Sequence, residues 1–165
     1  MKALFTAAIL TVAVLTPIHA VDERPNAAPS TTLAREPYAP GLGEIMTLTQ
    51  MRHLKLWFAG EAKNWDLAGY ELDELKEGFD DASKYFPTRD YVPIADLIGS
   101  TVMPALPNLK RAIDAHDGAK FSAAFDKLTA ACNACHQAAK HAFIVIQRPA
   151  ASPYANQSFA PPKKQ

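Results

Sequence analysis

Apolar side chains in the middle of this chain recur at alternating spacings of three and four residues, and this repeat limits the available folds more than any other feature. Its clearest run is Trp65, Ala68, Leu72, Leu75, Phe79, Ala82 and Phe86. The spacing places all of these side chains on one side of an α-helix, as in helices that pack side by side. No hairpin dipeptide separates alternating apolar runs, so strand signals are nearly absent. The expected fold class is all-α.

Four helices are expected, covering residues 43–61, 65–85, 93–116 and 118–146. Asn64 and Asp117 precede the second and fourth helices, where their side-chain oxygens can cap the first turn. Pro104 and Pro107 should break or kink the third helix, because each removes a hydrogen bond and collides with the preceding turn. Four helices with short connections predict an antiparallel four-helix bundle.

The expected bundle, residues 43–146, lies between segments of different character. Residues 1–20 resemble a secretory signal peptide, with Lys2 before an uncharged apolar stretch and cleavage expected near Ala20. An uncleaved N-terminal anchor is the alternative. Residues 21–42 form a proline-rich linker and residues 147–165 a proline-rich tail, which can still pack onto the bundle. A cleaved leader predicts a periplasmic protein.

The charge balance excludes two classes of partner. The chain has 17 Lys plus Arg and 17 Asp plus Glu, and the predicted leader contributes only one of these charges. A nearly neutral protein has no electrostatic footprint for nucleic acid or for anionic lipid. We therefore expect no nucleic-acid partner, and no membrane association after the leader is removed.

Both cysteines lie in one short motif, Cys132-Asn133-Ala134-Cys135-His136. A disulfide between them would close a tiny loop and would hardly constrain the unfolded chain. The Cys-x-x-Cys-His pattern is instead the attachment signature of c-type haem. Thiols at i and i+3 share a helix face and can add to the two vinyl groups of a porphyrin, and the next residue offers an imidazole to iron. One covalent haem c is expected, with His136 as the proximal iron ligand.

Two other interpretations of the motif remain open. A thioredoxin-like redox pair requires its cysteines at a helix N-terminus, where the helix dipole lowers a thiol pKa. The motif here falls within an expected helix and has no neighbouring βαβ pattern. A zinc site requires four ligands, for which Cys132, Cys135 and His136 would need His141 as a fourth.

With this motif on its last helix, the region of about residues 43–146 resembles the cytochrome c prime group of periplasmic four-helix-bundle cytochromes. The resemblance implies a haem within the bundle near the end of the fourth helix, with His136 proximal. It also implies that first-helix residues cover the other haem face. In some members that face is blocked by an apolar side chain, and in low-spin relatives a methionine ligates the iron. The proline-rich ends and a first-helix histidine depart from the family pattern.

Several residues are candidates for the distal side of the iron. Met46, His53 and Trp57 share one face of the first helix, and Met51 lies on the adjacent face. We rank His53 first, Met51 second and Met46 third as the distal ligand, with a vacant distal site as a further alternative. His53 could instead be a surface histidine, and the methionines could simply fill the core. Trp57 and Phe125 are candidate haem-pocket residues.

These features predict a monohaem c-type cytochrome that transfers single electrons to and from redox partner proteins. No proton relay or nucleophile is evident, so no enzymatic activity is expected. One alternative is a protein that binds or senses diatomic gases such as NO or CO. Another is a haem subunit of a larger redox complex. The sequence leaves both a monomer and a homodimer open.

Overall fold

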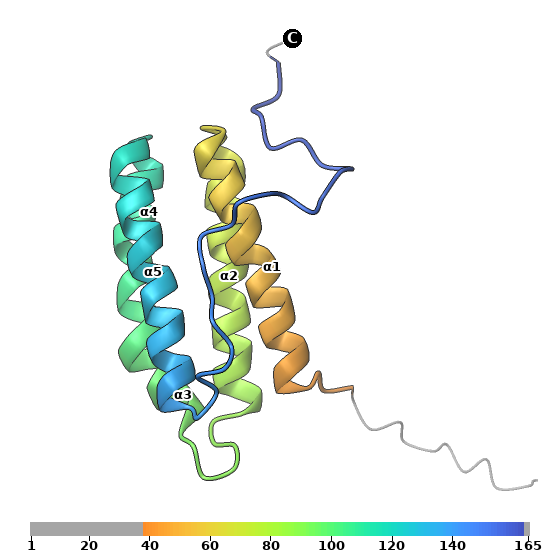
Figure 1. The fold of residues 1–165 in the computed structure, drawn as a ribbon, viewed down its shortest axis with the longest axis vertical. Helices are drawn as coiled ribbons and strands as arrows, with labels where there is room; N and C mark the ends of the chain where they lie inside the picture. The colour runs from red at the N-terminus through yellow and green to blue at the C-terminus, as the bar shows by residue number, and fades with distance from the viewer. Residues whose placement is uncertain (1–37, 164–165) are drawn as a thin grey trace, which may run out of the picture. The chain divides into compact units, whose positions relative to one another are not determined.

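Two long helices joined by a tight turn form one side of the molecule (Figure 1). The computed structural model describes residues 38–163, within a unit that spans residues 37–165. The predicted signal peptide and most of the linker lie outside the described residues. Helix α1 covers Leu42–Glu61 and helix α2 covers Trp65–Tyr85. The predicted N-cap of α2 is confirmed, because the Asn64 side chain accepts a hydrogen bond from the Leu67 N–H at 3.3 Å.

The third expected helix is broken in the region that its prolines predict. It begins as the short helix α3 (Ile94–Leu97), continues as a π-helical segment η1 (Ile98–Val102) and a 3-10 turn η2 (Met103–Ala105), and ends as helix α4 (Leu106–Asp114). Pro104 lies in the 3-10 turn and Pro107 in the first turn of α4. A proline is tolerated in a first turn, because its missing N–H has no partner there in any case.

Helix α5 covers Gly118–Ala138, so the prediction that it continues to residue 146 is wrong. Its start agrees with the sequence, since Asp117 caps the Lys120 N–H at 3.0 Å. At its other end Lys140 takes a left-handed conformation with a φ of 62°. The His141 N–H then donates to the His136 carbonyl at 2.7 Å and the Lys140 N–H to Gln137 at 3.1 Å. These two bonds form a Schellman motif, which ends the helix.

The core lies between the helices and follows the predicted repeats. In α2 the buried positions include Ala68, Leu72, Leu75, Phe79 and Ala82. Phe121, Phe125 and Leu128 contribute fully buried side chains from α5. Residues 38–163 contain no β-strand, only an isolated bridge between Arg89 and Val92. The all-α class is therefore confirmed for this part of the chain. No helix in it is both long and apolar enough to cross a membrane.

Beyond α5 the chain turns back and runs along the bundle (Figure 1). We call residues 141–160 the strap. From its start to its end the strap contacts His136, Asn133, Asp126 and Ser122 of α5 in descending order. It also contacts Trp57, Lys55 and Phe58 of α1, and at its end Asn64 just beyond that helix. The strap therefore runs against the direction of α5 and along that of α1.

Candidate functional site

A cavity of about 510 Å³ lies beside the Cys-x-x-Cys-His motif. This volume is in the range of roughly 300–1,000 Å³ that is usual for small-molecule and cofactor sites. The motif contributes three lining residues, Cys132, Cys135 and His136. Residues from α1, α2, the η1 segment and the strap complete the wall, among them Met46, Gln50, His53, Leu75, Phe79, Ile98, Val102, Ile144 and Ile146. The wall is largely apolar. Polar groups line it from α1 and α5, and so do the charged residues Arg89, Asp90 and Lys140.

The two cysteine thiols face this cavity from the last turns of α5. They are not joined in a disulfide. Burial, together with a smaller effect of the nearby Cys135, raises the pKa of Cys132 to about 12. Burial also raises the pKa of Cys135. Both thiols are therefore protonated at neutral pH, whereas a thioredoxin-like pair requires a thiol with a lowered pKa at a helix N-terminus.

His136 is oriented by the strap. Its Nδ1 lies 2.9 Å from the Ile144 carbonyl oxygen. A carbonyl can only accept, so this contact requires the proton on Nδ1 and leaves Nε2 as the nitrogen available to a metal. A hydrogen bond from the second ring nitrogen to a backbone carbonyl is the usual arrangement for a metal-ligating histidine.

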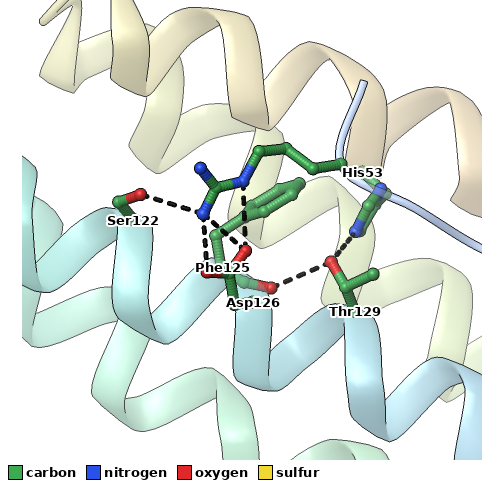
Figure 2. Close-up of polar contacts among 6 residues, drawn as sticks. His53, Ser122, Phe125, Asp126 and Thr129 are labelled. Atoms are coloured by element: carbon green, nitrogen blue, oxygen red, sulfur yellow. Dashed lines mark hydrogen bonds and ion pairs between the residues drawn. The ribbon is translucent and has the colours of Figure 1, made fainter. Parts of the chain in front are cut away.

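His53 is buried on the α1 side of the same cavity, with an exposed fraction of only 3%. This excludes the surface-histidine alternative. Its Nε2 lies 2.9 Å from the Thr129 hydroxyl on α5, and the Phe125 ring lies 4.4 Å away, centroid to centroid (Figure 2). Thr129 in turn donates to the Phe125 carbonyl at 3.0 Å. The Thr129 oxygen therefore accepts from His53 Nε2–H, and Nδ1 is the ring nitrogen left for another partner.

Burial lowers the pKa of His53 to about 4. The cost of taking an imidazolium out of water causes this shift, so the neutral imidazole is the form present at neutral pH. A neutral imidazole is also the form that binds a metal. Its protonation state therefore suits His53 to the role of a distal ligand, although its Nε2 is engaged by Thr129.

The other α1 candidates divide into two groups. Met46 lines the cavity together with His53, as expected from their shared helix face, and Gln50 lines it as well. Met51 is half-buried and does not line the cavity. On geometry Met46 therefore stands ahead of Met51 as a methionine candidate.

The two aromatic residues that the sequence nominated for a haem pocket lie deeper in the core. Trp57 and Phe125 are buried against each other, with ring centroids 4.9 Å apart, and neither lines the cavity. Arg148 of the strap covers the Trp57 ring at 4.3 Å and pairs with Asp126, whose Oδ2 lies 2.6 Å from its Nη2. Phe125 supports the site indirectly, because its ring packs against His53.

Sequence reasoning missed the residues that support the site from outside the motif. Thr129 and Asn133 are polar positions on α5 to which the sequence pattern assigns no role. For Ile144 and Ile146 the pattern predicts the fourth helix, whereas both lie in the strap. For Thr129 a signal was available, because it follows Phe125 by one helical turn and so lies on the packed face. For the two isoleucines there was none, because nothing in the sequence marks the end of α5.

His141, the possible fourth zinc ligand, lies beyond the end of α5 and lines the cavity beside the motif. Even so, residues 38–163 contain no group of three His, Cys, Asp or Glu side chains that could hold a metal ion by themselves. The four residues considered for zinc are therefore not gathered as a ligand set. A haem iron needs at most two axial ligands from the protein, so it does not depend on such a group.

Comparison of the chain with protein-family models, characterised proteins and solved structures gives no match.

Proposed function

We propose that this protein is a monohaem c-type cytochrome that transfers single electrons in the periplasm. One observation carries the proposal. Cys132, Cys135 and His136 face the same largely apolar cavity, and buried His53 faces it from another helix. Three of these residues form the haem-attachment motif, and the fourth is a second imidazole. The resemblance to the cytochrome c prime group supports an antiparallel bundle with the haem near the end of α5.

Each residue has a defined task in this proposal. Cys132 and Cys135 would hold the haem covalently, through thioether bonds formed by adding their thiols to its two vinyl groups. His136 would ligate the iron through Nε2, the nitrogen that the hydrogen bond from Nδ1 to the Ile144 carbonyl leaves free. Leu75, Phe79, Ile98 and Val102 provide apolar surface for the macrocycle. Haem supplies the one-electron chemistry, while burial and the axial ligands set its potential. Redox partner proteins would supply and accept the electrons, and we propose no enzymatic step.

The hydrogen bond between His53 and Thr129 favours keeping gas binding as a second candidate function. His53 can ligate iron through Nδ1, or through Nε2 after leaving Thr129. If it does neither, the sixth position is open to a small molecule such as CO or NO. The two candidate functions therefore differ in whether the His53 imidazole binds the iron or leaves the sixth position open.

Spectra of the exported protein distinguish these functions. For electron transfer we expect reversible one-electron reduction and a six-coordinate ferrous spectrum that CO does not change. A ferrous spectrum that CO shifts at stoichiometric amounts would support gas binding instead. Thr129→Val removes the hydroxyl at nearly constant volume and should increase the six-coordinate fraction if Thr129 restrains His53. A protein that binds haem but cannot be reduced and reoxidised would contradict electron transfer.

A further inference from the structure

Asn133, one of the two variable residues of the motif, holds the strap by two hydrogen bonds. Its Nδ2 donates to the Ile146 carbonyl at 2.8 Å, and its Oδ1 accepts from the Ile146 N–H at 2.8 Å. The side-chain amide therefore satisfies both backbone groups of one strap residue, as a neighbouring β-strand would. Only an amide side chain offers a donor and an acceptor in this arrangement.

The contact between Asn133 and Ile146 is in register with the contact between His136 and Ile144. Asn133 and His136 are three residues apart on α5, a rise of about 4.5 Å, so they lie on neighbouring parts of one face. Ile144 and Ile146 are two residues apart, about 6.6 Å in an extended chain, where alternate residues face the same way. Fixing Ile146 therefore fixes where the Ile144 carbonyl meets the His136 ring.

Within residues 38–163, no other side chain bonds both the N–H and the carbonyl of a strap residue. The next anchor along the strap is Arg148, which pairs with Asp126 and also bonds Ser122. Preceding Ile144, the strap is connected to α5 through a turn in which the Ile144 N–H donates to the His141 carbonyl at 2.9 Å. Phe143 and Val145, the neighbours of Ile144, are 79% and 71% exposed and so provide little packing.

We infer that Asn133 is a positioning residue for the proximal ligand: it clamps Ile146 so that the Ile144 carbonyl accepts from His136 Nδ1–H and orients the ring. The effect on iron rests on the proposed haem function, but the orientation of the ring does not. A hydrogen bond at Nδ1 makes the imidazole a stronger electron donor, which favours ferric over ferrous iron. Losing the clamp should therefore raise the reduction potential while both thioether bonds remain.

The test compares Asn133→Ala with Arg148→Ala, a matched control that loosens the strap at the next contact with α5, where Arg148 pairs with Asp126. In the exported protein, Asn133→Ala should favour ferrous iron by roughly tenfold, which is about 59 mV for one electron. Arg148→Ala should leave the potential within about twofold of the wild type. Asn133→Asp keeps the acceptor for the Ile146 N–H and should lie between wild type and Asn133→Ala. It also serves as the second variant if Asn133→Ala does not fold.

A readout that needs no haem separates this inference from the proposed function. In chain expressed without residues 1–20, nitrogen-15 spectra should show a slowly exchanging His136 Nδ1–H that Asn133→Ala loses and Arg148→Ala keeps. If wild-type protein carries no haem but this pattern holds, the proposed function fails and the positioning role stands. An unchanged His136 signal in Asn133→Ala, or an equal shift of potential in both variants, would overturn the positioning role.

Discussion

Replacing Gly60 with alanine tests how α1 meets α5. Gly60 is buried in the last turn of α1, and a Cβ at this position would overlap the Phe121 ring. That ring is only 1% exposed and lies among Trp57, Trp65 and Phe125, with centroids 5.9–6.2 Å away. The ring therefore has no free space into which it could move.

Two opposing effects decide whether Gly60→Ala raises or lowers the free energy of unfolding. Alanine is favoured over glycine in a helix by up to about 1 kcal/mol. Adding a carbon to a filled core costs about 1–3 kcal/mol, and the enclosed ring places this site at the upper end. The expected result for Gly60→Ala is a net loss of about 2 kcal/mol in the free energy of unfolding, measured by urea denaturation.

Gly69→Ala in α2 is the matched control. A Cβ at Gly69 would lie 4.0 Å from Ile113 Cγ2, which is an ordinary contact. This variant should gain about 0.5–1 kcal/mol, because only the helix propensity changes. If Gly60→Ala were as stable as Gly69→Ala, the packing of Phe121 against the end of α1 would be refuted.

Two further predictions concern buried ionisable groups. Arg52→Met should cost about 3 kcal/mol in unfolding free energy, because it leaves the Glu71 carboxylate, which is 1% exposed and lies 3.1 Å from Arg52, without its partner. Adding Glu71→Gln to that variant should restore part of the loss, and no recovery would contradict this explanation. The lowered pKa of His53 means that the unfolded chain takes up a proton before the folded chain does as pH falls from about 6.5 to 4. The haem-free protein should therefore lose about 2 kcal/mol between about pH 7 and pH 5 from this residue alone, a loss that His53→Gln should remove in urea titrations at both pH values.

The helical repeats could be predicted from the sequence because burial imposes them directly. The repeat in residues 65–86 and the prolines at 104 and 107 identified both a packed helix and a broken one. The end of α5 could not be predicted in this way. Lys140 takes the left-handed conformation that usually marks a glycine, so no glycine indicates the stop. Lys63 and His116 take the same left-handed conformation just after the ends of α1 and α4.

The remaining features that the sequence does not predict depend on contacts between segments far apart in the chain. Glu71 of α2 is buried because Arg52 of α1 reaches it, and no local spacing in the sequence indicates that pairing. The motif predicts Cys132, Cys135 and His136 as site residues because its spacing is local, and all three line the cavity. The partner of His53 could not be read from the sequence, because Thr129 is 76 residues away and meets it only in the folded protein.

The central claim is that Cys132 and Cys135 hold a haem covalently, and a pyridine haemochrome spectrum of the exported protein tests it most directly. We predict one haem per chain that stays attached under denaturing conditions, with a spectrum typical of two thioether bonds. Cys132→Ala combined with Cys135→Ala should abolish the attached haem, whereas His53→Ala should keep it. A wild-type protein without attached haem, or a spectrum unchanged by the double substitution, would contradict the account.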